Sequence, residues 1–266
     1  MTLINAIQKR KTLVTLHKIV SANKTFGTAF YYQSKILTDH LDQYTETMRK
    51  AMLCKINTTP SKFIPHEFLV KPNNENVLLV VFGGDRGFCG SLNQRLAAHI
   101  QDYRQNQQAQ QVFIFGQKLA HMMSHAEHSN LEPKKHWLHE FVKEMIKSIN
   151  SQQITQVVFL TVDNRQTVIK NMLPLLNNIK IEKDSNFLET NDCQLGSFGP
   201  SLLMAEILLW CARTKKAENL ERMLSMTQAA KNCDESIVIA QRLINRLRQQ
   251  NITQSLLEIG SVSNIE

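Results

Sequence analysis

The positions of the helix-breaking residues constrain this chain more than any other feature of its sequence. All six prolines lie between Pro60 and Pro200, and eight of the nine glycines lie outside the first 59 residues. Because proline removes a backbone donor and clashes with the preceding turn, long helices can form at the two ends of the chain but not in its middle. The sequence therefore predicts helices over about residues 3–57 and 201–259.

The lengths of these two helices limit how they can be buried. A helix of about 59 residues is about 88 Å long, whereas a compact chain of this size would be roughly 47 Å across. Apolar residues recur at helical spacing in both ends, so the two stripes are best buried against each other as an antiparallel coiled coil that forms a rod. The expected stripe positions are Leu13, Leu16 and Val20 in the first helix and Leu220, Met223, Thr227, Ala230, Ile237 and Ile244 in the second.

The middle of the chain alternates between two kinds of segment. The runs at 77–82, 112–115 and 157–162 are short and almost wholly apolar, which indicates buried strands. Helix-compatible stretches at 92–104, 117–125 and 137–149 separate or follow them, as in a parallel α/β sheet. We therefore expect a helix over 1–59, a Rossmann-like α/β domain over 75–195, closed by a turn-rich segment at 184–200, and a second helix over 201–266.

Charge and cysteine usage narrow the class of protein. The net charge is +8, and the first 35 residues contain six basic side chains and no acidic one. This asymmetry indicates an acidic partner, which could be nucleic acid, anionic lipid or a protein surface, unless the charges only solvate a helix face. The five cysteines form no CxxC pair, and neither a secretory signal nor a membrane span is visible.

A glycine-rich loop, GGDRGFCG at 83–90, follows the first expected strand and precedes a helix. Backbone N–H groups at this place hold phosphates in many α/β proteins. The loop lacks the Lys-Ser or Lys-Thr of a P-loop and the G-x-G-x-x-G spacing, so a structural loop is favoured over a nucleotide site. Cys89, beside Arg86, could act as a nucleophile, but no partnered base is evident and packing under the loop is the favoured role.

Histidines gather between the second and third expected strands. His121 and His125 are one helical turn apart, and His128, His136 and His139 follow. A metal site is conceivable at this spacing, but no H-E-x-x-H pattern or nearby cysteine supports it. Surface histidines are the favoured interpretation, and we expect neither a metal nor a cofactor.

Three separated motifs resemble the gamma subunit of F-type ATP synthases. The loop GDRGFCGSLN is similar to the D-R-G-L-C-G-x-L-N segment of that family, with Phe88 in place of leucine. The stretch from Glu221 to Asn232 resembles E-R-M-x-x-M-x-x-A-T-x-N, and the stretch from Asn245 to Ile259 resembles N-R-x-R-Q-x-x-I-T-x-E-x-x-E-I. In the first helix only Ile19–Lys24 resembles the family pattern, which suggests a divergent or alternate bacterial version.

The resemblance implies a function without an active site of its own. In that family the coiled coil turns inside a ring of alternating alpha and beta subunits and couples ion translocation to ATP synthesis or hydrolysis at the beta subunits. The expected partners are these subunits, the epsilon subunit and the membrane rotor ring of c subunits, at the cytoplasmic face of the bacterial inner membrane. The positions expected to contact the ring are Arg222, Arg248, Gln249 and Thr253, and the family-motif loop contains Asp85, Arg86, Gly87, Cys89 and Gly90.

Two other classes of function stay open from the residues alone. A nucleic-acid-binding adaptor would use the basic first helix, and its binding would weaken steeply with salt. A thiol-dependent enzyme would be built around Cys89. Neither class accounts for two long terminal helices, and no acid, base and nucleophile converge in the sequence.

Overall fold

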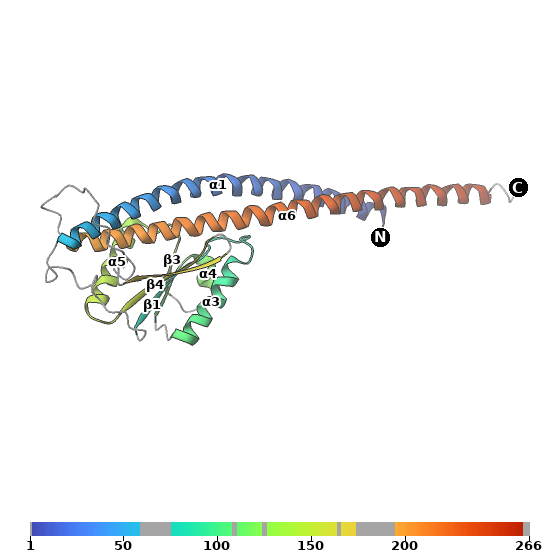
Figure 1. Ribbon diagram of the computed structural model, residues 1–266. Helices are drawn as coiled ribbons and strands as arrows, with labels where there is room; N and C mark the ends of the chain where they lie inside the picture. Colours follow the sequence, from blue (N-terminus) through green and yellow to red (C-terminus); the bar gives the residue numbers. More distant parts are fainter. Residues whose placement is uncertain are drawn as a thin grey trace. The chain divides into compact units, whose positions relative to one another are not determined.

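A computed structural model describes residues 2–58, 76–107, 111–123, 127–163, 166–173 and 195–262 (Figure 1). The described elements are, in chain order, α1 (Leu3–Thr58), β1 (Val77–Phe82), α3 (Leu92–Gln107), β2 (Gln111–Phe115), α4 (Gln117–Met122), β3 (Glu127–Ser129), α5 (Lys135–Asn150), β4 (Gln156–Asp163), β5 (Gln166–Leu173) and α6 (Leu195–Val262). The long helices at both ends and the α/β region between them confirm the expected fold class. None of the helices in these ranges combines enough length with enough apolar character to cross a lipid bilayer.

The second long helix begins earlier than expected. It starts at Leu195 rather than at residue 201, and Pro200 lies inside it. Pro200 is the sixth residue of the helix, so it removes one backbone hydrogen bond just after the first turn. Much of the turn-rich segment expected at 184–200, and the expected boundary near residue 75, lie outside the described residues, so the three-part division stays a prediction.

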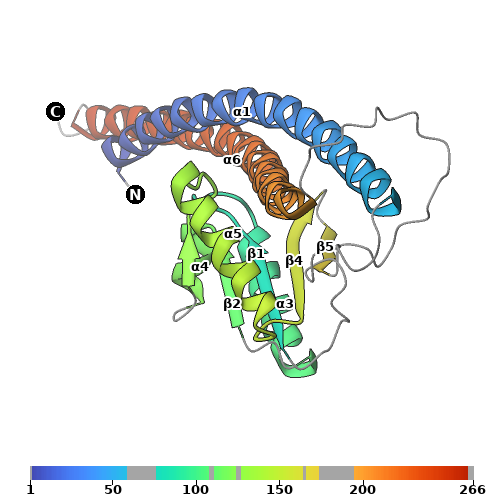
Figure 2. The same cartoon turned by 90° about the vertical axis from the view of Figure 1, so that its left-hand side faces the viewer.

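The chain forms two compact units. The terminal unit comprises Met1–Thr28 and Arg222–Glu266, and the sheet unit comprises Ala29–Glu221. Helices α1 and α6 both contribute residues to each unit. Within each unit the two helices lie side by side and run in opposite directions (Figures 1 and 2).

In the terminal unit, the buried seam differs in detail from the expected stripes. Ile244 is buried as expected, but Leu16 is 46% exposed and Thr227 is exposed. The half-buried residue next to Leu16 is His17, whose Nε2 lies 3.2 Å from Asp234 Oδ1 of α6. A helical stripe through residues 13, 17 and 20 has the same three-four spacing as one through 13, 16 and 20, so sequence spacing alone did not separate them.

The sheet of the sheet unit has the strand order β3-β2-β1-β4-β5. Neighbouring strands are parallel except for β4 and β5, which are antiparallel, so the expected all-parallel sheet was wrong at this edge. Leu79 of β1 lies between Val112 of β2 and Val158 of β4. The expectation missed β3 because its three residues are polar and largely exposed, and it missed β5 because polar residues interrupt its apolar ones.

Two hydrophobic clusters cover the two faces of this sheet. One face packs against α5 and against Leu203, Ile207 and Trp210 of α6. The other packs against α3 and α4 and against Ala217 of α6. Helix α6 therefore contributes to both clusters, and the Trp210 ring lies 5.8 Å from the Phe82 ring and 5.5 Å from the Phe159 ring, measured between centroids.

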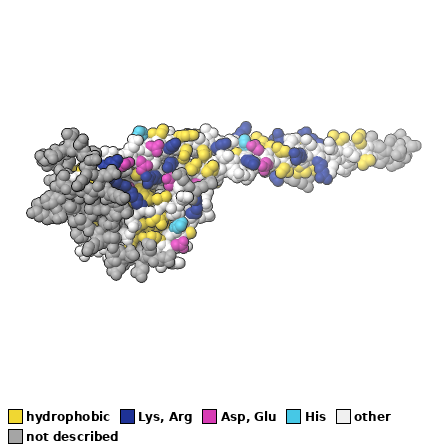
Figure 3. Space-filling view, viewed as in Figure 1, with side chains coloured by type: hydrophobic (Ala, Val, Ile, Leu, Met, Phe, Trp, Pro, Cys, Tyr) yellow, Lys and Arg dark blue, Asp and Glu magenta, His cyan; other side chains and the backbone are white. Residues whose placement is uncertain are grey.

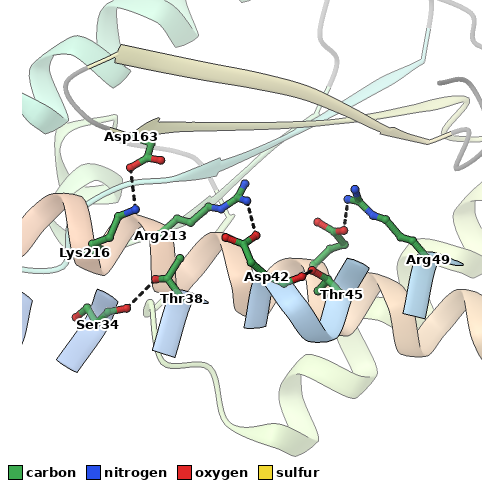
Figure 4. A network of polar contacts seen from close by, with 9 residues as sticks. Ser34, Thr38, Asp42, Thr45, Arg49, Asp163, Arg213 and Lys216 are labelled. Atoms are coloured by element: carbon green, nitrogen blue, oxygen red, sulfur yellow. Dashed lines mark hydrogen bonds and ion pairs between the residues drawn. The ribbon is translucent and has the colours of Figure 1, made fainter. Parts of the chain in front are cut away.

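Ion pairs join α1 to α6 in the sheet unit (Figure 4). Asp42 of α1 pairs with Arg213 of α6 at 2.5 Å, and Arg49 of α1 pairs with the fully buried Glu206 of α6. The buried Thr38 and Thr45 satisfy their hydroxyls on carbonyl groups of their own helix. Two ion pairs therefore connect α1 to α6 in this unit, at residues that are not among the expected stripe positions.

Candidate functional site

The family-motif loop, residues 83–90, follows the carboxyl end of β1 and precedes α3. The strand order places this end at the point where the chain switches from the β2 side of β1 to the β4 side. In open α/β sheets, ligands bind in the crevice at such a switch point. The loop is therefore where a phosphate would be held if the domain bound one.

Asp85 is the central residue of this loop. Its Oδ1 accepts a hydrogen bond from the backbone N–H of Gln117 at 3.0 Å, and its Oδ2 accepts one from the N–H of Leu131 at 3.1 Å. Gln117 is the first residue of α4, where the helix has backbone donors without intrahelical partners. The Asp85 carboxylate thus ties the loop to the start of α4 and to the segment before α5.

The other motif residues shape the loop or lie on its surface. The Cys89 thiol is buried and donates to the Arg86 carbonyl at 3.5 Å, which fits packing under the loop better than a nucleophile. Gly90 has a φ of 56°, and a Cβ atom there would lie 3.0 Å from Glu221 Oε2. A Cβ atom at Gly87 would meet nothing within 4 Å, whereas the neighbouring Phe88 is 74% exposed with a φ of 62°.

Helix α6 contributes side chains beside this loop. The hydroxyls of Thr161 in β4 and Thr214 in α6 lie 2.6 Å apart, and the Thr161 hydroxyl also donates to the carbonyl of Phe82 at 3.1 Å. The buried carboxylate of Glu218 accepts from the Asp85 N–H at 3.3 Å. Side chains of the same polypeptide therefore stand where the fold class places a ligand.

Charged residues of α6 also reach the segments around the crevice. Lys215 pairs with Glu132, and this hydrogen bond, with a smaller contribution from Arg86, holds the pKa of the Glu132 carboxyl below its ordinary value. Lys216 pairs with Asp163 at the end of β4, at 3.3 Å (Figure 4). Glu221 also pairs with Arg95 of α3 at 3.2 Å, so charged residues of α6 reach α3, the end of β4 and the segment before α5.

The histidines do not assemble into a metal site within the described ranges. The rings of His121 and His128 are 6.4 Å apart between centroids, and His136 pairs with Glu140 on the surface of α5. Among the described residues, no group of three or more histidine, cysteine or acidic side chains could hold a metal ion. His125 lies outside these residues.

The expected ring-contacting residues lie in the terminal unit and do not form one site. Arg248, Gln249 and Thr253 are exposed close together on α6, whereas Arg222 is half-buried about 39 Å along the helix from Arg248 at 1.5 Å per residue. An open, shallow groove runs along one helix face here and is lined by Arg246, Gln249, Gln250, Thr253, Gln254 and Leu257. The Thr253 hydroxyl donates to the Gln249 carbonyl at 3.0 Å.

The end of α6 extends past the start of α1. The pairing of His17 with Asp234 in antiparallel helices places Leu3 opposite about residue 248. Residues beyond that point have no α1 residue beside them, and Ile252, Leu256 and Leu257 are 60–70% exposed there. An apolar helix end of this kind is suited to contact with another protein.

The terminal unit also contains most of the chain's excess positive charge. Its sequence contains ten lysines and arginines against four acidic residues, a net charge of +6 out of the total of +8. Figure 3 shows basic side chains along the visible face of this part. The surface is therefore suited to an acidic partner.

The functional residues that sequence reasoning missed are the carboxylates of α6. Glu206, Glu218 and Glu221 are buried, and each contacts an element far away in the sequence. Glu206 gave a visible signal, because it interrupts the apolar run at 202–212. A charge in such a run is expected to have a buried partner, although the run itself does not identify Arg49.

Comparisons with known proteins agree on one family. A family model described as ATP synthase matches residues 3–264. An ATP synthase gamma chain of Buchnera aphidicola subsp. Schlechtendalia chinensis is 28% identical in an alignment that covers 75% of this chain and 76% of that protein. An ATP synthase gamma chain of Clostridium botulinum (strain 657 / Type Ba4) is 24% identical in an alignment that covers 97% of this chain and 95% of that protein.

Solved structures share the fold. A chain of the Euglena gracilis mitochondrial ATP synthase rotor, in rotational state 1, has a TM-score of 0.63 and 15% identity, covering 94% of this chain and 98% of that chain. A chain of the Tetrahymena thermophila mitochondrial ATP synthase central stalk and c-ring has a TM-score of 0.54 and 14% identity, covering 79% and 99%. Because the family model matches nearly the whole sequence and the curated relatives bear one name, this chain belongs to the ATP synthase family and to its gamma chains.

Proposed function

We propose that this chain is the central rotor shaft, the gamma subunit, of a rotary F-type ATP synthase. It couples ion translocation through the membrane sector to ATP synthesis or hydrolysis at the beta subunits. The observation that carries this proposal is the family match over residues 3–264, in a chain whose two ends pair as antiparallel helices. Such a pair resists bending and splaying because the backbone hydrogen bonds are continuous along each helix.

The terminal unit is the part proposed to turn inside the ring of alpha and beta subunits. Its net positive charge favours binding to acidic loops of the ring, and the exposed apolar side chains at the end of α6 favour close packing against an apolar surface of the ring. Arg248, Gln249 and Thr253 are exposed as such contacts require, and the half-buried Arg222 would contact the ring at a separate level.

The sheet unit is proposed to lie near the epsilon subunit and the rotor ring of c subunits and to have no catalytic role. The burial of Cys89 and the contacts of α6 at the switch point support a structural role, since the thiol is packed under the loop and α6 side chains lie where the fold class places a ligand. Nucleic acid is not among the proposed partners.

The proposed location is the cytoplasmic face of a bacterial inner membrane, with peripheral attachment through the complex. Both curated relatives described above come from bacteria, which favours this location over a mitochondrion. Their identities of 24–28% fit a divergent version of the subunit, and the altered first helix fits an alternate complex.

A tagged pull-down from native membranes tests the function. The proposal expects two larger ATP-binding proteins in excess over this chain, in a complex that hydrolyses ATP and pumps ions. Recovery of the chain alone would contradict the proposal. Recovery with nucleic acid, released by moderate salt, would instead support the adaptor function.

A further inference from the structure

A side chain of α6, Glu218, lies at the family-motif loop. In ligand-binding α/β domains, the backbone N–H groups after the first strand point at a bound phosphate. Here the Asp85 N–H points at the Glu218 carboxylate of α6, which is 4% exposed. A buried anion of the chain therefore takes the place of a ligand anion.

Asp85 also connects α6 to other elements of the sheet unit. Its backbone N–H faces α6, while its carboxylate faces the N–H groups of Gln117 and Leu131. These two donors belong to α4 and to the segment that follows β3. Asp85 thus joins α6 to α4 and to the segment that follows β3.

The loop around Asp85 is built to keep this position fixed. Gly84 donates its N–H to the Asn93 side chain at 2.8 Å, and Gly83 donates to the Phe115 carbonyl at 2.8 Å. A Cβ atom at Gly83 would lie 2.4 Å from Leu119, so the loop is packed directly onto α4. Because these contacts fix the loop, the charge-assisted hydrogen bond between the Asp85 N–H and Glu218 holds α6 in one position.

We propose that residues 83–90 form a socket for α6, and that Asp85 and Glu218 are the positioning residues through which force passes between α6 and the sheet. The inference rests on the proposed function, because only a rotating shaft must transmit torque between these elements. The ligand crevice of the fold is used here to anchor a helix. The pairs of Lys215 with Glu132 and of Lys216 with Asp163 flank the socket and resist sideways movement of α6.

Hydrogen exchange on the full chain tests the contact itself. Glu218→Ala removes the acceptor, and we expect the Asp85 amide to exchange about ten- to a hundredfold faster, as for the loss of a hydrogen bond to a charged group. Glu218→Gln keeps an acceptor oxygen at the same reach and is expected to stay close to the wild type. Glu144→Ala, at an exposed site on α5, is the control. An unchanged Asp85 amide in Glu218→Ala would overturn the proposed contact.

Coupling in the assembled complex tests the mechanical role. Glu218→Ala and Asp85→Asn are expected to keep ATP hydrolysis but to stop ATP-driven ion pumping at a smaller opposing gradient than the wild type. Asp85→Asn is the milder variant and serves if Glu218→Ala does not fold, because its amide nitrogen would face the Leu131 N–H instead of accepting from it. Asp102→Asn, at an exposed site on α3, is its control and is expected to pump normally.

The outcomes separate this inference from the proposed function. If the wild type assembles and pumps but both variants sustain the wild-type gradient, the loop packs against α6 without bearing force and the inference is overturned. If the wild type does not assemble with the catalytic subunits, the proposed function fails and the force-bearing role fails with it. The exchange measurement then still decides whether Glu218 holds the loop.

Discussion

Replacing Arg49 with methionine would expose how much the helix interface of the sheet unit depends on one buried charge. The Glu206 carboxylate is fully buried, and Arg49 pairs with it while remaining one third exposed. Removing one partner of a fully buried ion pair costs about 3–5 kcal/mol, because the other charge is left without compensation. Since Arg49 is partly exposed and Lys170 also lies within electrostatic range of Glu206, we expect Arg49→Met to lower the free energy of unfolding by about 2–3 kcal/mol.

The double variant Arg49→Met/Glu206→Leu separates the cost of an unpaired charge from the worth of the pair. Apolar replacement of both partners of a buried ion pair is often neutral, so we expect a change within about 1 kcal/mol of the wild type. Urea unfolding of the full chain, followed by circular dichroism and tryptophan fluorescence, measures these differences. Lys50→Met, which removes an exposed pair with Glu46, is the control and is expected to leave the free energy of unfolding essentially unchanged.

Additive losses in the free energy of unfolding would contradict this prediction. If the double variant lost as much stability as the two single variants together, Glu206 and Arg49 would not be coupled, and the buried carboxylate would have another source of compensation. A loss below about 0.5 kcal/mol for Arg49→Met would lead to the same conclusion.

Four further predictions follow from the structure. Gly116→Ala is expected to destabilise the chain by several kcal/mol, because φ is 125° and the new Cβ would lie 2.3 Å from the Gly83 carbonyl oxygen. Gly87→Ala is the control and is expected to leave the thermal unfolding midpoint unchanged, since a Cβ atom there meets nothing within 4 Å. Burial lowers the pKa of Lys170 below its ordinary value of 10.5, so the unfolded chain binds the proton more tightly than the folded chain. The free energy of unfolding of the wild type, relative to that of Lys170→Met, is therefore expected to rise with pH between the lowered pKa and 10.5. A difference that does not change with pH in denaturant titrations would contradict this. Leu256→Ser, at a side chain 64% exposed, is expected to leave the isolated chain equally stable but to weaken co-purification with the catalytic subunits. Ala230→Pro is expected to uncouple ATP turnover from ion pumping, since it breaks α6 in its interior; normal coupling in vesicles would count against the shaft function.

Local sequence signals predicted those parts of the fold that depend on neighbouring residues. The absence of prolines at both ends predicted α1 and α6, and uniform apolar runs predicted β1, β2 and β4. The short polar β3 and the antiparallel edge strand β5 lack such a pattern, because pairing with a neighbouring strand stabilises them. The start of α6 was missed because a proline usually precedes or ends a helix, whereas Pro200 lies inside α6.

The candidate site depended mainly on contacts that sequence patterns do not encode. The sequence identified the loop at 83–90 and its position after a strand, but the partners of Asp85 lie 32 and 46 residues away, and Glu218 lies 133 residues from it. No periodicity links such positions. The exposed polar residues at the end of α6 were found only through resemblance, since an exposed glutamine or threonine on a helix has no distinguishing local signal.

The two ion pairs between α1 and α6 in the sheet unit also define which alignment of the helices is allowed. Asp42 and Arg49 are one heptad apart, and so are their partners Arg213 and Glu206, with the signs in opposite order. If one helix slid by a heptad, Arg49 would face Arg213, or Asp42 would face Glu206, depending on the direction. Both shifts bring like charges together and move Arg49 away from the fully buried Glu206 carboxylate, which opposes them. These four side chains thus favour one register of the two helices. A shift by one heptad under load would break both ion pairs and bring like charges together.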